Sequence, residues 1–483
     1  MQLQWNKKSC PYMKTQVRQV QQQEQTLEVR LSEEQPDIGR VLCACGQPIV
    51  RSKEWRGDGM HVSGGISVSV LYLAEDGSGI KTVETWLPFQ AKWNFSQAQR
   101  ECVIRANCLV RELEARIISA RKMMIRANMS ILAEAMEPAV AELSIPEALP
   151  KEVELLTNVY PAILPREAGE KQFFVEEELI VPDVAKWIGF SVCPVSTEEN
   201  IVGDRIVLRG YGMIHYIYLD TQGMIRNGDQ EISFAQFADL SHEYDKEATA
   251  DVIFCVSSLE HENTADGVRI HCGMNAQYRV WDRMLLEIAE DAYSPNAVLT
   301  VSDETLELPV ELDNMIQTVN AEYQFRDGRI LETLFLPNHP AVYREGNMAH
   351  IELSGVFHFL YTDMDGNLQS AFENWLDEVS LLAAEGCQII SSLENVEMAP
   401  NGARIRFRVQ TCANQRMNMI TGVTVGEPMP LDPARASLIL RRMDVESLWE
   451  LAKTTGSTMD AIRKANQLTQ EPQQGQMLLI PVI

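Results

Sequence analysis

Two histidine-glutamate pairs come nearest in this sequence to a general base or a zinc site. They are His242-Glu243 and His261-Glu262, and the chain contains eight histidines in all. A zinc protease needs a second histidine four residues after the first on a helix, in the order H-E-x-x-H. That order does not occur. Both pairs stand in polar segments typical of loops, so we expect solvated surface residues rather than a base or a metal ligand.

Asp363, Asp365 and Gly366 are spaced like the first residues of a calcium-binding loop. Such a loop has glycine at its sixth position and glutamate at its twelfth. Counted from Asp363, the glycine is fourth and the twelfth residue is Asn374. We therefore expect a hairpin turn here. We identify no metal site, no catalytic residue and no cofactor site elsewhere in the sequence.

Glycines and arginines give two further weak signals. Gly210-Tyr-Gly212 begins like a dinucleotide-binding loop, but His215 replaces the third glycine, and no G-K-[ST] sequence occurs. Arg404, Arg406 and Arg408 alternate along one expected strand face. They predict either a solvated face paired with nearby glutamates, which we favour, or a contact with an acidic partner.

The stretch from Gly57 to Gly77 occurs three times and shows how the chain is organised. Adding 146 to its numbers gives Gly203 to Gly223, and adding a further 143 gives Gly346 to Gly366. A tyrosine stands five residues before each final glycine: Tyr72, Tyr218 and Tyr361. Alternating apolar residues predict a strand, and the glycine predicts a tight turn with positive φ. We expect the tyrosine to serve packing.

The three copies share glycines, a tyrosine and apolar residues, without a common acid, base or nucleophile, and such positions build a scaffold. Each copy continues into a further strand pair. We therefore predict a mainly β chain of three repeated antiparallel β-rich modules, followed by a small α+β domain of βααβ order. The modules are placed at 14–137, 166–298 and 322–427, and the last domain at 437–483.

The 483 residues carry a formal charge of −26. A surface of this sign repels phosphate backbones and anionic lipid, so we expect no nucleic-acid partner. No run of 18 apolar residues and no signal-peptide core occurs, so we expect neither membrane insertion nor export.

Cys43-x-Cys45 is too closely spaced for the usual redox or zinc motif. The cysteines in strand-like runs, Cys108, Cys255, Cys272 and Cys412, are expected to be small hydrophobic residues in a reducing cytoplasm.

Segments between the modules are less regular. Residues 1–35 predict a leading strand or a partly ordered arm. Prolines punctuate the stretch from Pro138 to Pro165, where we expect short helices near Ala133 to Leu143 and near Lys151 to Val159. Three prolines between Glu427 and Pro433 predict a stiff, extended spacer before the last domain.

The final residues predict strand, helix, helix and strand. Leu438 to Leu440 is a short apolar run, and Ser447 is placed to cap a helix that Gly456 ends. Ser457 or Thr458 can cap a second helix, and Met477 to Ile480 reads as the last strand.

This order, with Leu448-Trp449-x-Leu451-Ala452 and Leu479-Ile480-Pro481, resembles the LysM domain. The family binds N-acetylglucosamine polymers in a groove between the loop after the first strand and the loop before the last. The resemblance implies that the groove residues here are Met443, Asp444, Val445, Glu446, Ser447, Asn466, Gln467 and Leu468. The family usually has Gly-Asp-Thr or Gly-Asp-Ser where this chain has Val445-Glu446-Ser447, which fits a domain adapted to contact protein.

The repeats contain Pro36-Asp37-Ile38 with Val41-Leu42, the Gly64 to Tyr72 hairpin, Arg121-Lys122 before Ile125, and Asp291-Ala292-Tyr293-Ser294. With these motifs they resemble the SPOCS domain of endospore-forming bacteria. Three such modules and a LysM-like end resemble coat morphogenetic proteins of clostridia. The resemblance implies a non-enzymatic adaptor in the mother-cell cytoplasm. Its last domain would dock onto the ATPase of the coat basement layer at the forespore surface.

Two other functions remain open. The chain would be a peptidoglycan or cortex glycan-binding protein if the LysM-like groove binds N-acetylglucosamine polymer. It would be a hydrolase with a LysM anchor if the repeats held a catalytic set, which we do not find. An edge strand in each module also offers a site for self-association.

Overall fold

The computed structural model describes residues 4–56, 59–94, 101–150, 153–310, 316–338, 341–366, 368–382, 388–399, 402–429, 436–445 and 447–482. Nearly all regular structure in this part of the chain is β-strand, arranged in several antiparallel sheets. Two helices are found there, and both lie near the C-terminal end. The prediction of a mainly β chain is confirmed.

The first part of the chain forms two three-stranded sheets, with the orders β2-β3-β4 and β1-β6-β5. Their bounds are β1 Trp5–Arg30, β2 Ile38–Arg56, β3 Gly59–Ala74, β4 Ile80–Asn94, β5 Val103–Ser119 and β6 Lys122–Pro146. Alternate side chains of both sheets meet in one apolar cluster, for example Ile66 and Ile125. Tyr72 is buried there and its hydroxyl donates to the Pro36 carbonyl at 3.1 Å, so its packing role is confirmed.

The next part of the chain again forms a three-stranded sheet, β10-β9-β8, beside the strands β11-β12-β7 of a larger sheet. The bounds are β7 Glu154–Leu179, β8 Val184–Val202, β9 Arg205–Asp220, β10 Ile225–Asp239, β11 Thr249–Asn263 and β12 Val268–Tyr293. Ile206 and Ile214 of β9 pack with Ile270 and Met274 of β12 in a second apolar cluster.

The third group of strands surrounds β17 and β20. The bounds are β13 Ala297–Val310, β14 Ile316–Gln324, β15 Arg329–Pro337, β16 Ala341–Glu345, β17 Met348–Thr362, β18 Leu368–Leu382, β19 Gln388–Ala399 and β20 Gly402–Pro428. β17 pairs with β15, β16 and β18. β20 pairs with β14 and β19 along one part and with β13 along another. It thereby joins β11-β12-β7 in one seven-stranded sheet.

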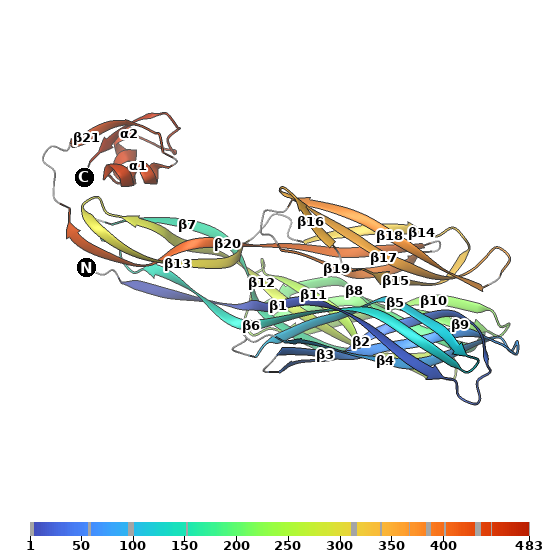
Figure 1. Cartoon of the computed structure of the whole chain (residues 1–483). Coiled ribbons are helices and arrows are strands. Elements are labelled where there is room, and N and C mark those ends of the chain that lie inside the picture. Colours follow the sequence, from blue (N-terminus) through green and yellow to red (C-terminus); the bar gives the residue numbers. More distant parts are fainter. Residues whose placement is uncertain are drawn as a thin grey trace.

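One end of the seven-stranded sheet extends as a stalk, at the left of Figure 1, where β7, β13 and β20 run together. One apolar cluster joins them there. Its fully buried members include Leu143 of β6, Leu164 of β7, Leu286 of β12 and Leu308 of β13. The stalk is therefore a packed part of the scaffold.

Both helices that the sequence predicted between the first two modules are wrong. Ala133 to Leu143 lies inside β6, and Glu154 to Val159 lies inside β7, while residues 151 and 152 fall outside the described residues. Alanines favour helix locally, but β1 pairs with β6 from Trp5 to Arg30 and buries Ala133 and Ala135 completely. The same pairing makes the N-terminal segment a strand.

Turn glycines take the predicted conformation. Gly77, Gly223 and Gly366 have φ of 74°, 77° and 82° and end the three recurring strands. The segment from Asp363 is a hairpin turn between β17 and β18, in which the Asp363 carboxylate accepts from the Asp365 amide at 3.0 Å.

The last domain contains β21 Leu438–Arg442, α1 Leu448–Thr455, α2 Met459–Asn466 and β22 Met477–Pro481. Ser447 caps α1, Gly456 ends it in the left-handed conformation, and Thr458 caps α2. The predicted βααβ order and caps are confirmed. In Figure 1 this domain lies beside the far end of the stalk.

Neither helix in the described part of the chain is long and apolar enough to cross a membrane.

Candidate functional site

The two loops that the sequence singled out in the last domain lie against each other. The Met443 amide donates to the Gln476 carbonyl at 2.8 Å, and the Gly475 amide donates to the Met443 carbonyl at 2.8 Å. Gly475 has φ of 86°, and a Cβ there would lie 3.0 Å from the Arg442 guanidinium. The backbone favours glycine at this position because a positive φ strains residues that carry a Cβ.

Most of the predicted groove residues serve the domain itself. Met443, Val445 and Leu468 pack in its apolar cluster. Ser447 accepts from the Glu450 amide at 3.2 Å, and Gln467, with φ of 51°, ends α2. Asp444 is exposed beside Arg441, at 3.8 Å, and Glu446 lies outside the described residues. The side chains left for a ligand are therefore few.

Asn466 ties helix α2 to strand β22. Its Oδ1 accepts from the Leu479 amide at 2.8 Å, and its Nδ2 donates to the Leu479 carbonyl at 2.6 Å. Nδ2 also donates to the Ile462 carbonyl at 2.9 Å. Both ends of the amide are thus used inside the domain, as expected of a residue that positions a strand.

The last domain contacts the end of β12 through Asp291 and Tyr293. The Asp291 carboxylate accepts from Trp449 Nε1 at 2.8 Å and pairs with Lys453 at 2.7 Å. The Tyr293 hydroxyl donates to the Ser457 carbonyl at 2.8 Å, and its ring meets Trp449 edge-on at 4.7 Å. Burial favours the neutral form of Asp291, but its bonds to Lys453 and Trp449 outweigh this and lower its pKa.

The two-stranded sheet of this domain has one apolar face turned to solvent. Leu438, Leu440, Met477 and Leu479 are 53%, 61%, 52% and 40% exposed. Leu440 pairs with Leu479 across the sheet, so these side chains share one face. The alternate residues Leu478 and Ile480 are buried against the helices. A face of this kind is typical of a protein contact.

Four buried charges join the first and second groups of strands. Arg105 of β5 pairs with Asp251 of β11 at 3.0 Å, and Arg279 of β12 pairs with Glu134 of β6 at 2.8 Å. Arg279 also pairs with Asp251 at 2.9 Å, and Arg105 lies 3.7 Å from Glu134. All four are buried. Burial opposes ionisation of Glu134, but Arg279, Arg105 and the neighbouring Arg18 outweigh it and lower its pKa.

His215 joins the second and third groups of strands. Its Nδ1 lies 2.6 Å from the Asp229 carboxylate, and its Nε2 lies 2.8 Å from the Glu332 carboxylate of β15. Burial lowers its pKa, but the two carboxylates outweigh burial and raise the pKa to about 10. The imidazole is therefore a permanent cation at neutral pH, and it binds two strand groups together rather than acting as a base.

The sequence analysis did not identify this cluster, although the pairing of His215 with Asp229 could have been predicted. The predicted hairpin around Gly223 places Asp229 directly opposite His215 in the strand register. Glu332 lies more than a hundred residues away in β15, and only the tertiary structure brings it to the same histidine.

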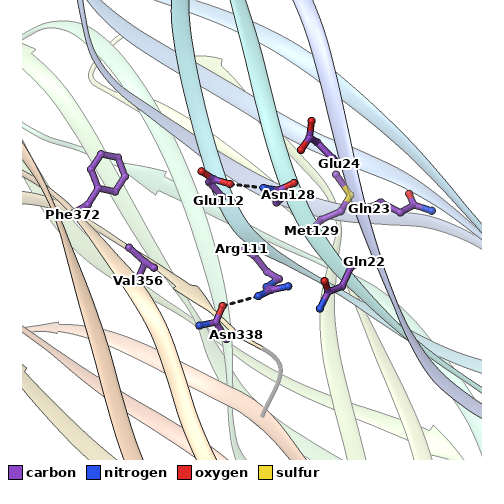
Figure 2. Close-up of a pocket in the computed structure, with 10 residues that line it drawn as sticks. All are labelled: Gln22, Gln23, Glu24, Arg111, Glu112, Asn128, Met129, Asn338, Val356 and Phe372. Carbon is purple, nitrogen blue, oxygen red and sulfur yellow. Dashed lines mark hydrogen bonds between the residues drawn. The ribbon is translucent and has the colours of Figure 1, made fainter. Parts of the chain in front are cut away.

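A cavity of about 550 Å³ lies between β1, β5 and β6 on one side and β17 and β18 on the other (Figure 2). It is lined by Gln22, Gln23, Glu24, Arg111, Glu112, Asn128, Met129, Asn338, Val356 and Phe372. Arg111 donates to Asn338 at 2.8 Å, and Asn128 donates to Glu112. Seven of these ten side chains are polar or charged.

The acidic side chains of the cavity are paired with an arginine. The two carboxylates that could move a proton, Glu24 and Glu112, both pair with Arg126, at 3.1 and 3.7 Å. Phe372 is 59% exposed and stacks on His358 at 4.1 Å. Burial lowers the pKa of His358 to about 4, so this imidazole is neutral.

The remaining sequence signals lie on the surface or in the core. His242 is exposed in a loop, while His261 and Glu262 are exposed at the end of β11, so their predicted loop is wrong but their exposure is confirmed. Arg404 is exposed and Arg406 half-buried; the side chain of Arg408 lies outside the described residues.

Buried cysteines behave as the sequence predicted. Burial raises the pKa of Cys108 and of Cys272 to about 12 and that of Cys255 to about 11, so their thiols stay protonated and unreactive. The side chain of Cys412 lies outside the described residues. In the part of the chain that the structure describes, no group of three or more side chains could hold a metal ion.

Comparison with known proteins finds no matching family model, no matching curated protein and no matching solved structure.

Proposed function

We propose that this chain is a non-enzymatic structural adaptor of bacterial endospore coat assembly. Three SPOCS-like modules form its scaffold in the mother-cell cytoplasm. Its LysM-like last domain docks onto the ATPase of the coat basement layer at the forespore surface. The proposal rests on the sequence resemblance and on the scaffold and surfaces described above.

The β-bulges support the proposal of repeated modules. Three bulges interrupt the pairing of β2 with β3, at Ile38/Arg40, Val41/Cys43 and Val50/Ser52. Three interrupt the pairing of β8 with β9, at Val184/Lys186, Trp187/Gly189 and Ser196/Glu198. Adding 146 to each number of the first set gives the second set. Adding 289 to Val41/Cys43 gives Ile330/Glu332, the bulge between β15 and β17. Bulges are specific features of a fold, so shared positions favour a common origin.

Two surfaces of the last domain support the proposed docking function: its contact with the end of β12 and its exposed apolar face. Asp291 and Tyr293 hold one side of the domain against the scaffold. The apolar face of Leu438, Leu440, Met477 and Leu479 is turned to solvent. A domain fixed on one side and apolar on the other is suited to join the scaffold to a protein partner.

Deletion of Leu438 to Ile483 tests the proposal. We expect the truncated chain to stay folded and to lose recruitment to the forespore, because the docking face is gone. A full-length variant with Leu440→Ser and Leu479→Ser should lose recruitment in the same way. The measurement is localisation of a fluorescent fusion in sporulating cells, together with a pull-down of the basement ATPase. Normal localisation of either variant would contradict the proposal.

The alternative is a protein that binds cortex glycan through the LysM-like groove. Its support is the close pairing of the two loops through Met443 and Gly475. Sedimentation with purified peptidoglycan separates the two functions. Asp444→Ala is the informative variant, since Asp444 is exposed at the groove, whereas a change at Asn466 would disturb β22. Strong retention that is lost in Asp444→Ala would favour the alternative.

A further inference from the structure

The buried charges Arg105, Glu134, Asp251 and Arg279 pair with their own counterparts in the other module. Arg105 and Asp251 are 146 residues apart, and Glu134 and Arg279 are 145 residues apart. The first spacing is that of the repeat, so Arg105 and Asp251 are equivalent. Glu134 lies opposite Arg105 in the strand register, and Arg279 lies opposite Asp251, so Glu134 and Arg279 are equivalent as well. Each residue therefore contacts the residue at its equivalent position. Contact between equivalent positions is the mark of a two-fold interface. Modules 1 and 2 therefore meet here as two copies of a dimer would.

Charge alternates around this ring of four. Arg105 lies opposite Glu134 within module 1, Glu134 pairs with Arg279, Arg279 pairs with Asp251 within module 2, and Asp251 pairs with Arg105. The exposed fractions are 2%, 5%, 3% and 7% for Arg105, Glu134, Arg279 and Asp251. Arg18 adds a further cation opposite Glu134 in the strand register. Water screens charges little at this depth, so their order matters.

The alternation exists only between unlike modules. If module 1 met another module 1 in this way, Arg105 would face Arg105 and Glu134 would face Glu134. If module 2 met another module 2, Asp251 would face Asp251 and Arg279 would face Arg279. Both ion pairs across the interface would then become buried contacts between like charges, which are strongly unfavourable.

We propose that these four residues determine which module pairs with which: module 1 accepts module 2 and rejects a second copy of itself. They thereby keep the chain from joining to other chains through like modules. The inference depends on the proposed repeat, but not on the proposed role in coat assembly.

Module 3 lacks charges at the corresponding positions. Arg105 and Asp251 each stand five residues before a β-bulge, at Val110/Glu112 and Val256/Ser258. The bulge in β19 is at Leu393/Asn395, and the residue five positions before it is Gln388, which pairs with Cys412. Module 3 therefore has neither a cation nor a carboxylate at this position, so it cannot form these ion pairs with module 1 or module 2.

Charge exchange within one module tests the proposal in the full chain. Arg105→Glu with Glu134→Arg reverses module 1, and Asp251→Arg with Arg279→Asp reverses module 2. Either exchange alone places like charges at both cross-module contacts, so we expect the equilibrium constant for closing the interface to fall roughly 100-fold or more. The two exchanges together restore the alternation and should recover most of the loss.

The measurements are urea unfolding and hydrogen exchange of β5 and β11. The matched control exchanges the exposed pair Arg209 and Glu198, which lie 2.9 Å apart. It should leave both measurements unchanged. Recovery in the combined variant supports the proposal. Single exchanges that behave like the original chain, or a combined variant no better than the single ones, would overturn it.

A second variant covers the case in which the single exchanges fail to fold. Replacing the four residues with apolar ones, Arg105→Met, Glu134→Leu, Asp251→Leu and Arg279→Met, keeps the interface packed but removes the charge rule. We expect this chain to fold and to form additional dimers or larger species in sedimentation velocity. Sedimentation identical to that of the original chain would refute the proposed rule.

Discussion

His215 shows what a single buried side chain contributes between two strand groups. It lies within ion-pair distance of Asp229 and Glu332, and these carboxylates raise its pKa to about 10 although burial opposes the charge. Removal of the imidazole would leave the half-exposed Asp229 carboxylate and the buried Glu332 carboxylate without the cation between them. Such a residue is a structural cation that holds the second and third groups of strands together.

The stabilisation that His215 contributes should decrease as the pH rises. The folded pKa of His215 lies above its ordinary value of 6.5, so folding takes up a proton when the pH exceeds 6.5. The stabilisation is complete below pH 6.5 and is lost as the pH rises towards about 10. We expect His215→Gln to cost about 3 kcal/mol below pH 6.5 and progressively less up to pH 10.

Urea unfolding at several pH values measures this difference. His242→Gln is the matched control, because His242 is exposed in a loop, and it should have little effect at any pH. A difference between His215→Gln and the original chain that does not change with pH would contradict the prediction.

At the scale of elements, two kinds of glycine shape the recurring strands. A Cβ on Gly210 would lie 2.1 Å from the Val195 carbonyl oxygen and 2.8 Å from the Phe234 ring, while a Cβ on Gly64 would lie 2.1 Å from the Ile49 carbonyl oxygen. Gly223 has φ of 77° and open space around it. The first kind permits close packing of strands, and the second permits a turn.

The two kinds predict different costs for the same substitution. Gly223→Ala strains only the backbone, so we expect a loss of about 1 kcal/mol in the free energy of unfolding. Gly210→Ala forces a clash with a paired strand, so we expect about 3 kcal/mol or failure to fold. Thermal or urea unfolding of both variants checks the order. Equal losses would show that β8 can shift to accept a Cβ.

At the scale of the whole molecule, Asp291 and Tyr293 at the end of β12 connect the last domain to the stalk. Asp291→Ala removes the acceptor of Trp449 and the partner of Lys453. We expect the domain to stay folded but to separate from the end of β12, because the contact loses about 1–2 kcal/mol of binding free energy. Trp449 fluorescence and hydrogen exchange around Tyr293 measure the release.

The matched control is Asp444→Ala, whose carboxylate lies at the surface beside Arg441. This variant should keep the domain in place. Because the pKa of Asp291 is lowered in the folded chain, its carboxylate stabilises the contact above its ordinary pKa of 3.8. This stabilisation is lost as the pH falls below that value. Release of the domain in Asp444→Ala to the same extent would contradict the specific role of Asp291.

Local features could be predicted from the sequence. Ser447, Gly456 and Thr458 bound the helices of the last domain as expected, and Gly77, Gly223 and Gly366 form the expected turns. A cap or a turn depends on a few neighbouring residues, so its signal is complete in the sequence. The recurrence of the Gly57 to Gly77 stretch was likewise visible at a fixed offset.

Contacts between distant strands decided the rest. Ala133 to Leu143 reads as helix, yet it is a strand because β1, more than a hundred residues away, pairs along its whole length. Arg105 gave no signal of its own, and neither did Glu332, because their partners lie on strands far away in the sequence. The sequence by itself determined where strands turn and how the helices are capped, since these follow from local conformational energy. Only the tertiary structure decided which buried charges meet, because burial and the distances between strands far apart in the sequence set the energy of those pairs.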